Sequence, residues 1–280
     1  MVWHWYLLAL IVSALAILLV WRAWDARADQ LSWDNLTEHQ TVDGSVFQSS
    51  LVADLPEPAQ RYFNYTIETG TLLKRVAEIE MEGELSLGRK GSPNYRPMKA
   101  RQISAAPFGF VWSLKWNGVS GSDGARAETS WTRFWLFNIV PIVHAGGDDH
   151  RRSSFGRMVA DSVFWAPASM LPSEHVTWQA LGPDSARVIV RYDDLEQGVD
   201  VHVDAEGKPY KIVFERWSDE NPDKVHRFQP FGGDLSGFES FGGYRLPTRV
   251  VAGNHYGTPD YVPFFKADVT DVQFPKPKDK

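Results

Sequence analysis

The 280-residue chain contains no cysteine. It therefore forms no disulfide and offers neither a thiolate metal ligand nor a cysteine nucleophile. An excess of positive charge is also missing, because the formal net charge is −6. Nucleic-acid-binding domains present a clustered basic face, so we expect no nucleic-acid partner. General disorder is excluded by a hydrophobic content of 43% that includes 12 Trp and 16 Phe.

Common catalytic motifs are absent from the sequence as well. It contains no P-loop, no dinucleotide fingerprint and no His-Glu-x-x-His motif. It also lacks a Gly-x-Ser-x-Gly nucleophile elbow, since Gly118-Val-Ser-Gly121 does not have that spacing. We therefore expect no cofactor, and the sequence favours a protein that is not an enzyme without settling the point.

The N-terminal segment is the longest apolar run in the chain. Residues 5–21 are interrupted only by Ser13, and together with Val2 and Trp3 the run approaches the length of about 20 residues that a helix needs to cross ~30 Å of hydrocarbon. Aromatic residues flank the run at both ends, as at the two interfaces of a membrane: Trp3, Trp5, Tyr6, Trp21 and Trp24. The pattern predicts a transmembrane anchor in residues 1–24 that contacts the membrane through residues 3–21.

A cleaved signal peptide is the alternative for this segment, because Ala26-Arg27-Ala28 has the small-x-small form of a cleavage site. We favour the uncleaved anchor, because no Lys or Arg precedes the run and the run is longer than most signal-peptide cores.

The orientation of the anchor remains open at this stage. Arg22 and Arg27 follow the span, and the positive-inside rule would then place the C-terminal domain in the cytoplasm. By analogy, single N-terminal anchors before aromatic-rich β domains more usually face outward. We therefore expect a single-pass protein of the inner (cytoplasmic) membrane with a periplasmic or extracellular domain, and the cytoplasmic side stays an alternative.

The remaining chain divides into a linker at residues 25–52, a β-rich domain at 53–274 and a polar tail at 275–280. Two helices are predicted inside the domain. The first begins at Asp54, which together with Glu57 has the spacing of a capping box. The second runs from Phe155, after a cap at Ser153 or Ser154, and ends before Pro167.

Strand patterns fill the rest of the domain. Apolar residues and glutamates alternate over residues 77–87, which is typical of a half-buried antiparallel strand. A second alternation at residues 108–116 is aromatic on one side, residues 118–124 are expected to form a loop, and residues 131–143 form either a buried strand pair or the lip of a cavity. Later strands are predicted at 176–181, 187–193, 199–204, 210–217, 245–256 and 264–274. This pattern predicts a mainly β (α+β) fold, a large twisted antiparallel sheet or open half-barrel with two packing helices.

Several ordered motifs carry a family resemblance. They are Leu55-Pro-Glu-Pro-Ala-Gln-Arg-Tyr62, Pro107-Phe-Gly-Phe-Val-Trp112, Val163-Phe-Trp-Ala-Pro-Ala-Ser-Met-Leu-Pro172, Phe241-Gly-Gly-Tyr-Arg-Leu-Pro-Thr248 and Ala267-Asp-Val-Thr-Asp-Val272. Over residues 55–274 the chain resembles a bacterial family of often membrane-anchored proteins that is defined as a domain of unknown function. The resemblance implies no activity and no catalytic residues. The order of elements also resembles the lipoprotein-carrier fold, a half-open barrel with a helical lid.

Two groups of residues are candidates for a site. Aromatic side chains could line an apolar cavity, although they could equally fill an ordinary core: Trp112, Trp116, Trp131, Trp135, Phe164 and Trp165. Arg157 and Asp161, which lie four residues apart, could pair at the surface or point inward. The second group is the polar segment 144–150, where His144, Asp148 and His150 could converge on a metal ion. A solvated loop is the alternative for this segment.

The sequence thus favours a membrane-anchored envelope protein that binds a lipid or another apolar ligand in a concave β-sheet. Two alternatives remain. One is a metal-dependent hydrolase that uses residues 144–150, and the other is an envelope scaffold without a ligand.

Overall fold

The computed structural model describes residues 2–41, 43–88, 91–126 and 128–276. Within them, 13 strands form one antiparallel sheet in the order β6-β5-β4-β3-β2-β1-β13-β12-β11-β10-β9-β8-β7. The strands are β1 (Ala77–Ser86), β2 (Tyr95–Ala105), β3 (Gly109–Trp116), β4 (Val119–Arg126), β5 (Thr129–Leu136), β6 (Val140–Ala145), β7 (Val176–Gly182), β8 (Ser185–Tyr192), β9 (Leu195–Val203), β10 (Pro209–Ser218), β11 (Arg227–Phe241), β12 (Tyr244–Asn254) and β13 (Val262–Gln273). The predicted mainly β fold with a large antiparallel sheet is confirmed.

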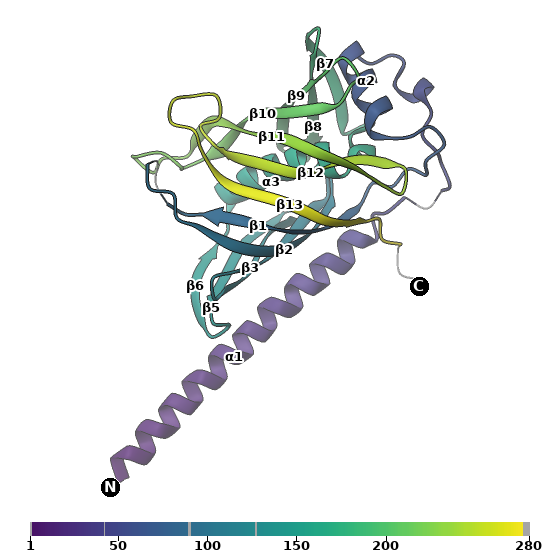
Figure 1. Ribbon diagram of the computed structural model, residues 1–280. Helices are drawn as coiled ribbons and strands as arrows, with labels where there is room; N and C mark the ends of the chain where they lie inside the picture. The colour runs from purple at the N-terminus through teal and green to yellow at the C-terminus, as the bar shows by residue number, and fades with distance from the viewer. Residues whose placement is uncertain (1, 42, 89–90, 127, 277–280) are drawn as a thin grey trace.

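The sheet curves around a single long helix, α3 (Asp148–Trp165), as Figure 1 shows. We call the face that packs on α3 the concave face and the opposite one the convex face. The main hydrophobic core lies between α3 and the concave face, and alternate residues of each strand enter it. The core is closed at one end by α2 (Glu57–Thr66), which buries Tyr62 and Phe63.

The N-terminal helix α1 runs without interruption over Val2–Thr37. By length and composition, residues 3–37 include a stretch apolar enough to cross a membrane, and the most apolar window buries no side chain against the domain. The second half of α1 lies along the convex face, where Trp33 and Leu36 are buried (Figure 1). The segment predicted as a linker from residue 25 is therefore helical as far as Thr37, because it packs on the sheet.

Both domain helices begin elsewhere than predicted. Pro56 precedes α2 and no side chain caps that helix, so the capping box predicted from Asp54 is wrong. α3 starts at Asp148 after Gly147, and the first turn places two carboxylates near the positive end of the helix dipole. The segment predicted as a polar loop therefore contributes the first turns of α3. The helix ends at Trp165, before Pro167, as predicted.

Two strand predictions also need correction. Residues 119–124, predicted as a loop, belong to β4, whose paired neighbours are β3 and β5. Residues 131–143 do form a strand pair, but β6 is an exposed edge strand, not a buried one. The predicted tail at 275–280 lies outside the described residues from 277 onward.

Candidate functional site on the concave face

Arg157 of α3 joins the helix to the sheet through an ionic cluster. Its Nη1 lies 2.6 Å from Oδ2 of Asp123 on β4, and its Nε lies 3.3 Å from Oδ2 of Asp161, one turn further along α3. Gln102 of β2 donates to the same Asp161 oxygen at 3.0 Å. The sequence left open whether Arg157 and Asp161 point outward or inward, and the structure turns both toward the sheet.

His150 extends this cluster toward the start of α3. Its Nε2 lies 2.8 Å from Oγ1 of Thr132 and 3.5 Å from Oδ1 of Asp123. Thr132 in turn donates to Asp123 at 2.8 Å. Asp123 is thus surrounded by an arginine, an imidazole and a hydroxyl, all within reach of its two oxygens.

The pKa values of the two carboxylates in the cluster are shifted in opposite directions. Burial alone would raise the pKa of Asp123, but the hydrogen bond from His150 and the charge of Arg157 outweigh it and lower this pKa to about 2. Burial raises the pKa of Asp161 above its ordinary value, and the charge of Arg157 opposes that rise only in part. Asp123 is therefore the partner that holds its negative charge firmly.

A second buried cation faces the same region. Arg216 of β10 donates to Oγ of Ser153 at 3.2 Å and lies 5.1 Å above the ring of Phe231. Burial, followed by the charge of Arg157, lowers the pKa of Arg216 to about 10. Arg157 itself stacks on aromatic rings, with 4.8 Å to the centroid of Trp112. The concave face therefore combines cations with aromatic surface.

The six predicted aromatic residues do not share one surface. Trp112, Phe164 and Trp165 are buried in the main core, and Trp116 packs against it while remaining partly exposed. In contrast, Trp131 and Trp135 point to the convex face. Only the first four could contact a ligand on the concave face.

The convex-facing tryptophans have their own partners. Trp131 donates its indole N–H to Ser122 at 3.0 Å, and Trp135 donates to Asp25 of α1 at 3.1 Å. On the concave side, the indole nitrogens of Trp112, Trp116 and Trp165 are buried and have no hydrogen-bond partner among the residues that the structure describes. Buried polar groups without a partner are uncommon in folded proteins.

The three predicted metal ligands are not brought together. Nε2 of His144 on β6 lies 3.1 Å from Oδ2 of Asp25, on the convex side. His150 points to Thr132 and Asp123, on the concave side. Over the described ranges, no three His, Cys, Asp or Glu side chains are grouped so that they could hold a metal ion. The separation arises because His144 lies on the edge strand β6, whereas Asp148 and His150 belong to the first turn of α3, which packs on the concave face.

Sequence reasoning missed Asp123, Gln102, Thr132 and Arg216. Asp123 lies in the stretch Gly121-Ser-Asp-Gly124, which has the composition of a turn but pairs as a strand. The only signal for the cluster was the four-residue spacing of Arg157 and Asp161.

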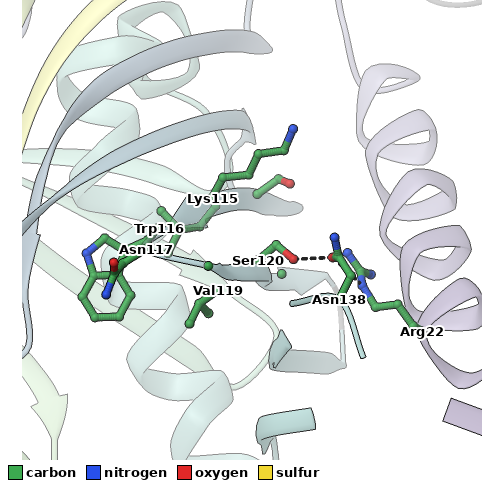
Figure 2. A pocket seen from close by; sticks show the side chains of 11 residues that line it. Arg22, Lys115, Trp116, Asn117, Val119, Ser120 and Asn138 are labelled. Atoms are coloured by element: carbon green, nitrogen blue, oxygen red, sulfur yellow. Dashed lines mark hydrogen bonds between the residues drawn. The ribbon is translucent and has the colours of Figure 1, made fainter. Parts of the chain in front are cut away.

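Two cavities lie away from the concave face. One of about 490 Å³ is bounded by α1 and by the turn that joins β3 and β4, where Arg22 and Lys115 line it. The other, of about 300 Å³, is lined by Phe108, His175 and residues near the end of α1. The first is shown in Figure 2.

A family model describes most of the domain. It is the family of unknown function DUF6544, and it matches residues 45–267. The chain belongs to this family. The match confirms the resemblance carried by the motifs in residues 55–274. No curated protein sequence matches the chain.

Similar solved structures include two from bacteria. A LolA superfamily protein from Nitrosomonas europaea is 9% identical, covers 78% of this chain and 91% of its own, and has a TM-score of 0.37. A putative outer membrane lipoprotein-sorting protein domain from Vibrio parahaemolyticus is 12% identical, covers 81% of this chain and 91% of its own, and has a TM-score of 0.40.

Proposed function

We propose that this DUF6544 protein is a single-pass membrane protein of the bacterial envelope that holds its sheet beside the membrane and binds a lipid or another apolar molecule on the concave face. The observation that carries the proposal is the continuity of α1. One helix of 36 residues exposes its apolar first half completely and packs its second half on the domain. Because one continuous helix both crosses the membrane and packs on the sheet, it holds the domain at a fixed distance from the bilayer.

The docked half of α1 favours an anchor that is retained. A signal-peptide cleavage after Ala28 would remove Asp25, which is 8% exposed and accepts the indole N–H of Trp135. It would also remove Trp21, whose ring lies 5.3 Å from that of Trp135. Cleavage would therefore expose to water the indole ring of Trp135, which is fully buried while α1 is in place, and exposing a large apolar side chain destabilises the fold.

The proposed ligand surface is formed by apolar side chains of the concave face that are partly exposed although they continue the buried core: Trp116, Phe134, Phe231, Phe264 and Phe265. The unpartnered indole nitrogens of Trp112 and Trp116 supply hydrogen-bond donors on the same side of β3. Aromatic surface with a few polar groups is the usual lining of a site for apolar molecules.

Photo-crosslinking in nanodiscs tests the ligand. The full chain is reconstituted with a phospholipid that carries a diazirine on its acyl chain, and labelled peptides are identified by mass spectrometry. We expect label on β3 and β13 in addition to α1, and we expect Trp116→Ala to lose the β3 label while keeping that on α1. Label confined to α1 would contradict ligand binding and leave the anchor intact. Arg245→Gln, on the far end of β12, is the matched control.

The absence of native cysteine gives a direct test of orientation. Leu181→Cys places one thiol on β7 at a position that is 46% exposed. We propose a domain on the outer face of the inner membrane, so a membrane-impermeant maleimide should label this cysteine in cells with intact inner membranes. Labelling only after lysis would place the domain in the cytoplasm.

A further inference from the structure

The cavity between α1 and the sheet has a polar, cationic lining. Arg22, Lys115, Ser120 and Asn138 are among the residues that line it. Figure 2 shows Arg22 approaching from α1 and Asn138 from the β5–β6 turn. Lys115 and Ser120 are directly opposite each other in the β3–β4 pair and so lie on the same face. The cavity is therefore built by three separate elements.

The two cations of this cavity have no carboxylate in direct contact. Over the described residues, neither Arg22 nor Lys115 forms an ion pair, although the charge of Arg22 acts on Asp29 further along α1. Asp25 is turned to Trp135 and His144. Oδ1 of Asn138 accepts hydrogen bonds from Ser120 and from Nε of Arg22, the latter at 3.4 Å (Figure 2). These bonds orient the amide and leave its Nδ2 as a donor. Two cations with an amide N–H donor suit a phosphate group.

An exposed apolar hairpin adjoins the cavity. Phe137 at its turn is 71% exposed, and Val140 and Ile142 on the edge strand β6 are 48% and 47% exposed. Phe137 and Asn138 both have positive φ angles, of 51° and 58°, which side chains other than glycine adopt at a cost of about 1–3 kcal/mol. Exposed apolar edge strands promote aggregation unless something covers them. The exposed phenylalanine at the turn and the uncovered edge strand therefore indicate a contact outside the domain.

The position of the hairpin identifies what covers it. Arg22 directly follows the apolar run of residues 3–21, and its contact with Asn138 places the β5–β6 turn where that run ends. Figure 1 shows this turn beside α1, on the side of the domain from which the exposed half of the helix emerges. Trp21 and Trp24 mark the same level with the residue type that prefers membrane interfaces.

From this geometry we infer a lipid-headgroup site. Arg22 and Lys115 bind the phosphate of an anionic phospholipid, while Phe137, Val140 and Ile142 enter the interfacial region of the same bilayer. This inference rests on the proposed anchoring by α1. It adds a second contact with the membrane, through the β5–β6 hairpin, and a preference for anionic headgroups. Each Lys or Arg close to an anionic membrane surface increases the affinity of a protein for that surface about fivefold.

Single cysteines test the contact of the hairpin with the bilayer. Val140→Cys and the control Leu181→Cys have comparable parent exposures, 48% and 46%, but Leu181 is on β7, at the opposite edge of the sheet. Each is labelled with an environment-sensitive fluorophore in nanodiscs of phosphatidylcholine and phosphatidylglycerol. We expect blue-shifted emission and quenching by acyl-chain nitroxides at position 140 and neither at 181. Equal, water-like emission at both positions would overturn the hairpin contact.

Native mass spectrometry of the full chain tests the headgroup preference. The protein is released from nanodiscs of equal phosphatidylcholine and phosphatidylglycerol, and we expect retained lipid to be enriched in phosphatidylglycerol. Arg22→Gln and Lys115→Gln should each reduce this enrichment about fivefold. The double variant Lys208→Gln/Lys224→Gln, which removes two cations at other sites, should keep it. Equal retention of both lipids by the unaltered chain would overturn the headgroup site.

Two further experiments distinguish a failure of the lipid-headgroup site from a failure of the proposed anchoring by α1. If inorganic phosphate protects Lys115 from acylation equally with and without anionic lipid, the cavity binds free phosphate and the lipid site is wrong. If alkaline carbonate releases the protein from membranes, the anchoring by α1 fails. Carbonate resistance with a water-exposed position 140 leaves the anchor standing and refutes the hairpin contact alone.

Discussion

Trp135 donates its indole N–H to the carboxylate of Asp25, 3.1 Å away, and so ties the turn of α1 that follows the apolar run to β5. The same carboxylate lies 3.1 Å from Nε2 of His144 and 3.9 Å from Nε of Arg133. Asp25, which follows the apolar run by a few residues, thus interacts with three side chains of the β5–β6 hairpin. These contacts hold the β5–β6 hairpin at a fixed position along α1, so the depth of α1 in the membrane also sets the distance of the hairpin from it.

Replacing this acid should loosen the domain from its anchor. We expect Asp25→Ala to lower the free energy of unfolding by ~1–3 kcal/mol, because the buried indole N–H loses its acceptor. Asp25→Asn keeps an oxygen in the same place and should lose less. Denaturant unfolding in detergent micelles, followed by tryptophan fluorescence, measures both. Equal losses in the two variants would show that the hydrogen bond to Trp135 is not what Asp25 contributes.

Removing Arg157 should destabilise the domain strongly. Arg157→Ala takes away the cation that lies within 3.3 Å of both Asp123 and Asp161, whose side chains are only 14% and 16% exposed, and breaking a buried ion pair from one side costs ~3–5 kcal/mol. The control is Arg151→Ala, which breaks a pair of 2.6 Å with Asp194 whose acid side is 72% exposed and which should cost below about 1 kcal/mol. Similar losses in the two variants would contradict a structural role for the concave cluster.

The sequence predicted the strands with alternating patterns because each of them buries one face. Residues 77–87 gave the bounds of β1 to within one residue, since apolar and acidic side chains alternate over its whole length. β4 has no such pattern, and its pairing with β3 and β5 is what makes residues 119–126 a strand. Neighbouring strands therefore decided the structure of the segment that carries Asp123.

The candidate site was only partly predictable for a related reason. β5 buries apolar side chains on both faces, so the sequence could not show that Trp131 and Trp135 point away from Trp112. The second half of α1 likewise has few apolar residues, and it is helical because Trp33 and Leu36 pack on the convex face. Both features depend on contacts between distant segments, which local patterns do not record.

At acidic pH, the free energy of unfolding should depend on the ionisation of Asp123. Its folded pKa of about 2 lies below the ordinary value of 3.8, so ionised Asp123 stabilises the fold above pH ~4, and this contribution is lost as the pH falls toward 2. The difference corresponds to about 2 kcal/mol. The gap in unfolding free energy between the unaltered chain and Asp123→Asn should therefore narrow between pH 5 and pH 3. A gap that stays constant over this range would contradict the lowered pKa.

The two faces of the sheet should respond differently to the same tryptophan substitution. Trp131→Phe removes the hydrogen bond to Ser122, whereas Trp112→Phe removes an indole N–H that has no partner. Both changes lose similar volume, so Trp131→Phe should cost ~1–3 kcal/mol more than Trp112→Phe in denaturant unfolding of the purified chain. If the N–H of Trp112 serves a ligand, Trp112→Phe should also weaken acyl-chain crosslinking to β3 while leaving stability nearly unchanged. A larger stability loss for Trp112→Phe than for Trp131→Phe would show that the N–H of Trp112 has a hydrogen-bond partner in solution.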